Sequence, residues 1–392
     1  MAKKNPDERK KRHISTLVTQ IGRKPEDQFG FINPPTYRGS TVLFPDVATL
    51  ESLNQPYTYG TKGTPTVRSL EEAWSILAGA EDSVTVPSGL AAICLAVMTA
   101  TQAGDHILIT DSVYQPTRNF CDNILAKFGV MIEYYDPHLS DQIFHLFREQ
   151  TTAIIVESPG SQSMEIQDVP AISKAAHEKG ICVILDNTWA TPIFFPPHDR
   201  GADLVIEAGT KYLSGHSDLL IGLVSANKKW AKRLRTTFNA FAIGAGPDEC
   251  SLALRGLRTM ALRLNAQQKS ALEIADWLSK QEQVESVLHP ALVSHPDHNL
   301  WKRDFLGSSG VFSIILNERY RKYIAEFLDK LELFGIGFSW GGYESLVLPF
   351  DCKAYRTATR WDPPGPCLRF SIGLEDVNDL KEDLTIGLMR LS

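Results

Sequence analysis

Two stretches decide the fold that we predict for this chain: Val183-Ile184-Leu185-Asp186-Asn187-Thr188 and Thr210-Lys211-Tyr212-Leu213-Ser214-Gly215-His216-Ser217-Asp218. The first stretch begins with the apolar run Val183-Ile184-Leu185, and the second follows the apolar run Leu204-Val205-Ile206. The interval from Asp186 to Lys211 is 211 − 186 = 25 residues, about one strand–helix–strand repeat of a parallel sheet. We therefore expect an acid and an amine near the same edge of one sheet.

Outside these stretches, helical and strand-like patterns alternate. Residues 70–77, 89–100 and 168–179 are typical of helices, and Ser88 can cap the second of these. Residues 107–109, 154–156, 183–185, 204–206 and 219–224 are typical of short strands. This alternation predicts an α/β fold, with a mostly parallel sheet and helices on both faces.

Polar residues follow several of the predicted strands, namely Asp111, Glu157, Asp186 and residues 207–211. Because open α/β sheets bind ligands at the carboxyl ends of their strands, we expect a site there.

The length of 392 residues exceeds what one hydrophobic core usually supports. We expect an extended N-terminal arm with one short helix (1–60), the α/β domain (61–255) and a smaller C-terminal α+β domain (256–392). In the last part, residues 259–281 are typical of a long helix, and 311–316 and 368–372 of strands.

Composition and charge exclude several classes of function. The net charge of −6 gives no basic surface for nucleic acid, and no apolar run approaches the roughly 18 residues of a membrane span. The charged N-terminus is not a secretory signal. The six cysteines form no C-x-x-C pair, which favours free thiols in the cytoplasm. We expect no metal site.

The acid and the amine suggest pyridoxal phosphate as the cofactor. A lysine at position 211, among small and polar neighbours, could form the Schiff base. Asp186 could keep the ring nitrogen protonated, so that the ring accepts electrons from a carbanion. The alternatives are a solvated surface amine for Lys211 and a turn or cap residue for Asp186.

Three further residues have a functional and a structural interpretation. The helix start at Gly89 could bind a phosphate, or Ser88 could be an ordinary cap. The ring of Tyr114 could stack on a flat cofactor, or be a half-buried surface tyrosine. Arg369 lies between apolar residues, so it needs an anion, either a substrate carboxylate or an internal ion pair. A dinucleotide-dependent dehydrogenase is disfavoured, because no G-x-G-x-x-G follows an early strand.

Taken together, these segments resemble the cystathionine lyase and synthase family of pyridoxal-phosphate enzymes, from about Tyr57 to Leu391. The similar segments occur in one order: Tyr59-Gly60, Glu157-Ser158-Pro159-Gly160-Ser161, Asp186-Asn187-Thr188-Trp189-Ala190, Thr210-Lys211-Tyr212, Gly215-His216-Ser217-Asp218, Arg255-Gly256-Leu257-Arg258-Thr259 and Ser339-Trp340-Gly341-Gly342-Tyr343-Glu344-Ser345-Leu346.

The resemblance implies a fold type I cofactor domain and a homotetramer, built as a dimer of dimers with shared active sites. It also implies catalytic, cofactor-binding and substrate-binding roles. Lys211 would be the Schiff-base lysine and proton shuttle, Asp186 would pair with the ring nitrogen, and Tyr114 would stack on the ring. The phosphate would be held by Gly89, Leu90, Thr210 and, from a neighbouring subunit, Tyr59. The substrate would be held by Arg369, Ser339, Trp340 and Tyr59.

Within the family, the chain resembles the β-lyase branch at position 340, where that branch carries tryptophan and the γ-acting relatives usually carry leucine. This implies β-elimination of L-cystathionine to homocysteine, pyruvate and ammonia, a step of methionine biosynthesis. The alternatives on the same scaffold are γ-elimination, γ-replacement and cysteine desulfhydration. A non-catalytic binding protein is a further alternative, which the intact Lys211, Asp186 and Arg369 disfavour.

Two positions depart from the family pattern. Relatives usually carry arginine at the position of Thr61, where it contacts a phosphate across the dimer, so Lys62 or Thr61 is expected to take over part of that contact. Relatives also commonly carry a hydroxyl at the position of Ala208, so one phosphate contact is expected to be absent.

Overall fold

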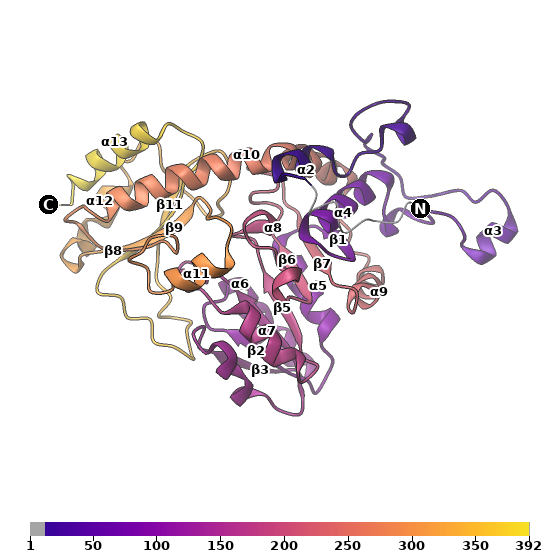
Figure 1. Cartoon of the computed structure of the whole chain (residues 1–392), viewed down its shortest axis with the longest axis horizontal. Helices are drawn as coiled ribbons and strands as arrows, with labels where there is room; N and C mark the ends of the chain where they lie inside the picture. The colour runs from indigo at the N-terminus through magenta and orange to yellow at the C-terminus, as the bar shows by residue number, and fades with distance from the viewer. Residues whose placement is uncertain (1–11, 392) are drawn as a thin grey trace.

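A computed structural model describes residues 12–391, and its larger sheet has seven strands. They are β1 (Asp82–Val86), β2 (His106–Thr110), β3 (Met131–Tyr135), β4 (Thr151–Glu157), β5 (Cys182–Asp186), β6 (Leu204–Glu207) and β7 (Gly222–Ala226). Their order is β1-β7-β6-β5-β4-β2-β3, and neighbours are parallel except around β7, which is antiparallel to β1 and β6. The predicted mostly parallel sheet is confirmed (Figure 1).

Helices cover both faces of this sheet, as the alternating pattern predicts. Their bounds are α4 (Pro65–Ala78), α5 (Gly89–Ala100), α6 (Gln115–Asn123), α7 (Val169–His177), α8 (Thr191–Phe194), α9 (Ala231–Phe241) and α10 (Pro247–Leu278). Short 3-10 turns lie at η3 (Leu125–Phe128), η4 (Ser140–Leu146) and η5 (His198–Arg200). One apolar core joins the sheet to α5, α6 and α9, and another joins its opposite face to α4, α7, α8 and α10.

Local sequence signals explain where the helices begin. The hydroxyl of Ser88 accepts a hydrogen bond from the Ala91 N–H at the start of α5, and Asp168 does the same for Ala171 in α7. Each cap satisfies one of the N–H groups that lack a partner at a helix start. The start of α5 is thereby fixed beside the strand ends, where the sequence predicts the site.

A second, five-stranded sheet forms the C-terminal part, in the order β10-β11-β12-β9-β8. Its strands are β8 (Val284–Leu288), β9 (Val311–Leu316), β10 (Gly335–Ile336), β11 (Leu346–Phe350) and β12 (Cys367–Ser371). The helices here are α11 (His298–Asp304), η6 (Glu318–Tyr323), α12 (Ile324–Leu328) and α13 (Val377–Leu388). A third apolar core joins this sheet to α12, α13 and the end of α10.

Helix α10 has 32 residues and runs from the first sheet to the second (Figure 1). It begins at Pro247, earlier than the residue 259 predicted from the sequence, so the expected boundary between 255 and 256 lies inside a continuous helix. Pro at the first helical position has no N–H to satisfy, which suits a helix start.

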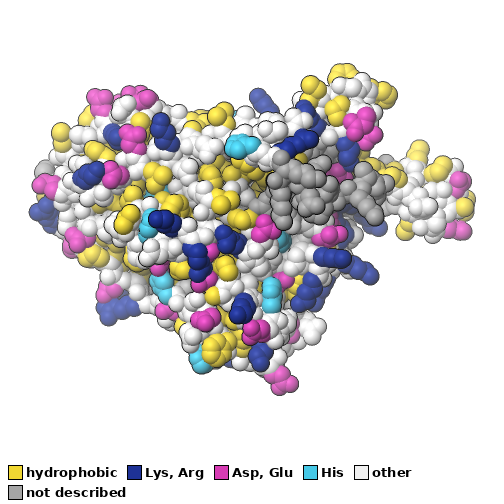
Figure 2. Space-filling model, viewed as in Figure 1, with side chains coloured by type: hydrophobic (Ala, Val, Ile, Leu, Met, Phe, Trp, Pro, Cys, Tyr) yellow, Lys and Arg dark blue, Asp and Glu magenta, His cyan; other side chains and the backbone are white. Residues whose placement is uncertain are grey.

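The described part of the arm, residues 12–60, contains more helix than predicted. Two α-helices, α2 (Ile14–Gln20) and α3 (Val47–Ser52), are joined by η1 (Pro25–Gln28), and η2 (Gly60–Lys62) follows. Arg258 of α10 holds α2 by donating to the carbonyls of Val18 and Ile21. The segment around α3 projects away from the body, and Figure 2 shows apolar side chains on it. Leu43 and Val47 of this segment are strongly exposed, as are Phe29 and Phe31 after η1.

Within residues 12–391, no helix is long and apolar enough to cross a membrane, and no group of three or more His, Cys, Asp and Glu side chains is arranged to hold a metal ion. All six cysteines are free thiols.

Candidate active site

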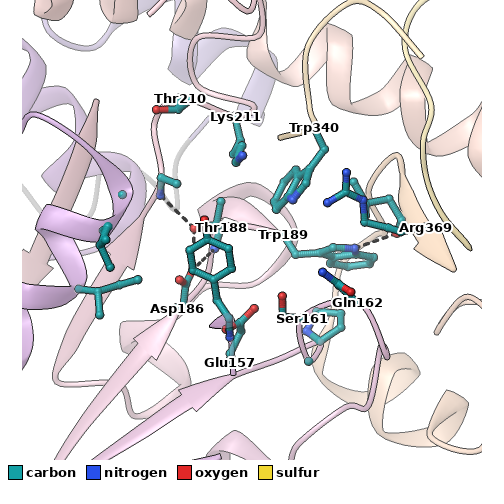
Figure 3. A pocket seen from close by; sticks show the side chains of 18 of the residues that line it. Glu157, Ser161, Gln162, Asp186, Thr188, Trp189, Thr210, Lys211, Trp340 and Arg369 are labelled. Atoms are coloured by element: carbon teal, nitrogen blue, oxygen red, sulfur yellow. Dashed lines mark hydrogen bonds between the residues drawn. The ribbon is translucent and has the colours of Figure 1, made fainter. Parts of the chain in front are cut away.

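A cavity of about 240 Å³ lies where the strand ends of the larger sheet meet the C-terminal part (Figure 3). Eight of the residues predicted from the sequence line it together: Gly89, Leu90, Tyr114, Asp186, Thr210, Lys211, Trp340 and Arg369. They come from positions 89 to 369 of the chain, so the fold assembles the predicted site from distant segments.

Lys211 follows β6 and directs its amine into this cavity. Its Nζ donates to Ser339 Oγ at 2.6 Å and lies 5.2 Å from the centre of the Trp340 ring. Burial first, and then the Arg369 cation, lower the pKa of Lys211 against the opposing effect of Asp186, and the net result is a pKa of about 8 instead of 10.5. A useful fraction of the amine is therefore neutral near neutral pH, as a nucleophile or base requires.

Asp186 ends β5 and turns its carboxylate into the cavity. Its Oδ1 accepts hydrogen bonds from the backbone N–H and the hydroxyl of Thr188, at 3.0 and 2.6 Å. Burial raises the pKa of Asp186, and the Thr188 hydrogen bonds and Lys211 oppose that rise. Thr188 Oγ1 in turn accepts from the Ala208 N–H at 2.9 Å, which ties the acid to the segment that carries the lysine.

The start of α5 forms the other wall of the cavity. A Cβ on Gly89 would lie 2.7 Å from the Cβ of Ala208, so only glycine fits while these two segments stay in contact. Ser88, Gly89 and Leu90 at the start of this 12-residue helix line the cavity, and the first N–H groups of a helix, which lack helical partners, can bind an anion. The Thr210 hydroxyl exchanges hydrogen bonds with the Ile221 backbone at 3.0 and 3.2 Å.

Arg369 lies in the middle of β12 and is 7% exposed. Its Nη2 donates to the Ser339 carbonyl at 2.8 Å, and its Nε is buried without a partner. Among the described residues, none of the ion pairs involves Arg369, which disfavours the internal salt bridge. Burial lowers its pKa to about 10, although Tyr114 and Tyr212 oppose this. The guanidinium is therefore available to a carboxylate in the cavity.

Two predicted residues lie elsewhere. Ser339 contacts Lys211 and Arg369 from the rim, in an adjoining cavity that Trp340 also lines. Tyr59 belongs to the arm, is half exposed and does not line the cavity of its own chain.

Sequence reasoning assigned no role to several residues that line the cavity: Glu157, Ser161, Gln162, Thr188 and Trp189. Figure 3 shows all five around Asp186 and Arg369. For Glu157 the signal was present, since it ends a strand. Asp111 and Glu207, predicted from the same signal, do not line the cavity. Asp111 binds the 357–359 loop. The register pairs Asp186 with Ile206, so the next residue, Glu207, points to the face of the sheet opposite to that of Asp186.

The donor set fits pyridoxal phosphate. The cavity offers an amine, a carboxylate, an aromatic ring and a capped helix start, in Lys211, Asp186, Tyr114 and Gly89. It also offers an unpaired buried guanidinium for an amino-acid carboxylate.

Comparison with known proteins agrees with this chemistry. A family model described as Cys/Met metabolism PLP-dependent enzyme matches residues 15–389. The chain is 50% identical over 386 residues (97% of this chain, 96% of the relative) to a protein of Rhizobium johnstonii provisionally named a cystathionine beta-lyase.

Two further relatives carry different names at similar identity. An L-alanine/L-glutamate racemase of Wolbachia pipientis is 40% identical over 392 residues, covering 96% of this chain and 97% of the relative. Cystathionine beta-lyase MetC of Escherichia coli is 38% identical over 391 residues, covering 96% and 98%.

Among solved structures, metB from Corynebacterium glutamicum superposes with a TM-score of 0.91 at 28% identity, covering 98% of this chain and 100% of that one. Fold, cavity and family match agree over nearly the whole chain. The chain belongs to the Cys/Met-metabolism family of pyridoxal-phosphate-dependent enzymes.

Proposed function

We propose that this enzyme cleaves L-cystathionine by β-elimination to homocysteine, pyruvate and ammonia, in methionine biosynthesis. The observation that carries the proposal is the environment of the Lys211 amine, which lies beside Ser339 and Trp340 in the cavity that Arg369 and Asp186 share. The relatives named cystathionine beta-lyase support the choice of substrate.

In this proposal, the cofactor is held by residues already in the cavity. Gly89 and Leu90 at the helix start, with Thr210, would hold the phosphate, Tyr114 would hold the ring, and Asp186 would supply the negative charge that keeps the ring protonated. When bound, pyridoxal phosphate supplies an electron sink for the bonds at the substrate α-carbon. Ala208 offers no hydroxyl, so it serves instead as the close neighbour of Gly89.

Arg369 binds and orients the substrate. Its free Nε and remaining N–H groups match a carboxylate in two-point fashion, and its other hydrogen bond anchors it to Ser339. Fixing the carboxylate fixes the direction of the α-hydrogen, which is a positioning contribution to the rate.

Lys211 moves the proton. With a pKa near 8, the amine accepts the α-hydrogen as a proton and returns it to the leaving sulfur, so that homocysteine departs as a thiol. Ser339 Oγ, 2.6 Å from Nζ, orients the amine between these two positions.

Racemisation is the second candidate, because a relative of similar identity is named as a racemase. It would use the same removal of the α-hydrogen but return a proton to the α-carbon. The γ-acting reactions and cysteine desulfhydration remain further alternatives on the same scaffold. Trp340 favours β-elimination through the family resemblance.

We further propose a cytoplasmic homotetramer in which two chains share each active site. The exposed apolar side chains around α3, including Leu43 and Val47, support a partner surface for the arm. Tyr59, outside the cavity of its own chain, would then reach that of a neighbour. The six free thiols support a reducing compartment. The described part of the arm, residues 12–60, would contact the neighbouring chain, while 61–255 and 256–391, joined by α10, form the body.

A Lys211→Ala variant tests the role of the amine. We expect no lyase activity, while the cofactor stays bound through its phosphate and gives a shifted visible band. Substantial pyruvate release by this variant would refute the role of Lys211. For the choice of reaction, Trp340→Leu should raise the ratio of oxobutyrate to pyruvate if Trp340 favours β-elimination.

A further inference from the structure

Glu157 is a cavity-lining carboxyl group that the mechanism above does not use. It is the last residue of β4, and Figure 3 shows it beside Asp186 on the same side of the sheet. The register pairs Glu157 directly with Asp186 of β5, so the two carboxyl groups leave neighbouring strands on one face.

The hydrogen bond of Glu157 reaches the backbone of Tyr114. Its Oε2 accepts from the Tyr114 N–H at 2.7 Å. Tyr114 stands at the start of α6, where no side chain caps the helix, and its own ring lines the cavity. The contact thus spans the distance between β4 and the segment that follows β2, and it fixes the backbone from which the Tyr114 ring projects.

The two neighbouring carboxyl groups have different surroundings. Asp186 accepts two hydrogen bonds from Thr188 and faces the Lys211 amine. The Glu157 carboxyl group accepts a hydrogen bond only from the Tyr114 N–H, which lowers its pKa, whereas burial and the charges of Asp186 and Glu165 raise it. Glu165 is itself paired with Arg356. Burial, and next the Asp186 charge, hold the pKa of Glu157 well above its usual range.

This asymmetry separates the roles of the pair. Of the two groups, Glu157 has the surroundings that favour the protonated form more, whereas the Thr188 donors and the Lys211 amine favour a negative charge on Asp186. A neutral carboxylic acid still accepts a hydrogen bond, so Glu157 holds Tyr114 without adding a second charge to the cavity.

We propose that Glu157 is a positioning residue of this active site, which holds the Tyr114 ring against the cofactor as an uncharged hydrogen-bond acceptor and leaves Asp186 as the charged partner of the ring. The proposal rests on the proposed function for its kinetic consequence only. Its spectroscopic consequence depends on cofactor binding alone.

Three variants test it: Glu157→Gln, which stays neutral and keeps an acceptor, Glu157→Ala, which removes the acceptor, and Tyr114→Ala, which removes the ring. The first readout is visible circular dichroism of the bound cofactor without substrate, because this signal follows the seating of the ring. We expect Glu157→Ala to change the band as Tyr114→Ala does, and Glu157→Gln to preserve it and the pH midpoint of its absorbance.

The second readout is turnover of L-cystathionine. We expect kcat of Glu157→Ala to fall between about tenfold and a hundredfold with little change in KM, as a misplaced ring would cause, and Glu157→Gln to restore most of the loss. In the Tyr114→Ala background, adding Glu157→Ala should cost little more.

Full additivity of the two alanine substitutions would overturn the proposal, as would a Glu157→Gln variant as impaired as Glu157→Ala, or one whose absorbance midpoint shifts. A protein that releases no product from cystathionine, yet shows the expected dichroism pattern, would refute the proposed function and leave this inference standing.

Discussion

Replacing Trp340 with alanine should raise the pKa of the Lys211 amine. The indole ring lies 5.2 Å from Nζ, and burial is the main reason that the pKa is about 8 instead of 10.5. Without the ring, water reaches the amine and stabilises its charged form. Arg369 remains in place and continues to lower the pKa, so only part of the shift should disappear.

The size of the effect follows from the two limiting values. At pH 7, an amine with a pKa of about 8 is neutral in about one molecule in ten, and one with the ordinary value in about one in 3,000. Loss of the whole shift would therefore cut the neutral fraction by about 300-fold. We expect a rise of about one pKa unit, which leaves about tenfold less neutral amine at pH 7.

The assay is the rate at which cofactor-free protein captures pyridoxal, measured across pH, with Lys211→Ala as the baseline. Pyridoxal is used because it lacks the ionising phosphate. The parent protein should show a midpoint near 8, Trp340→Ala a higher one, and Trp340→Phe, the matched control, a value close to the parent. A Trp340→Ala midpoint that stays near 8, or an equal shift in Trp340→Phe, would show that the Trp340 ring does not lower the pKa of Lys211.

Other positions give sharp tests. Asp111→Ala removes the acceptor of Arg118 and of three N–H groups in the 357–359 loop. It should lower the free energy of unfolding by about 3–5 kcal/mol, seen as a lower denaturant midpoint. An unchanged midpoint would show that Asp111 does not hold the loop in place. Gly89→Ala should weaken cofactor affinity at least about tenfold through the contact with Ala208, and adding Ala208→Gly should recover part of it; no recovery would mean that the contact is not the cause. Lys62→Ala should also weaken cofactor retention, and unchanged affinity would exclude a phosphate contact from Lys62.

Local patterns predicted five of the seven strands of the larger sheet and missed β1 and β3. They also indicated Gly89, Asp186 and Lys211 for the cavity, whereas the family resemblance indicated Leu90 and Trp340. Apolar runs that end in polar residues marked β5 and β6, and the Ser88 cap marked the start of α5 where the structure has it. Lys211 and Asp186 could be brought together by chain spacing alone.

What the sequence did not predict depends on side chains from distant segments. Strand β3, with the exposed or half-buried pattern of Met131 to Tyr134, gave no clear apolar run. Nothing near Glu157 in the sequence indicates that its partner is the Tyr114 N–H, 43 residues earlier. Asp111 has the same strand-end signal as Asp186, and only the loop at residues 357–359, 246 to 248 positions away, distinguishes the two.

The most direct test of β-elimination at this site is the keto acid released when purified, cofactor-loaded protein is given L-cystathionine. We expect pyruvate, with homocysteine and ammonia in equal amounts. Oxobutyrate, or no keto acid together with conversion of L-alanine to its D-form, would contradict the assignment of this site to β-elimination.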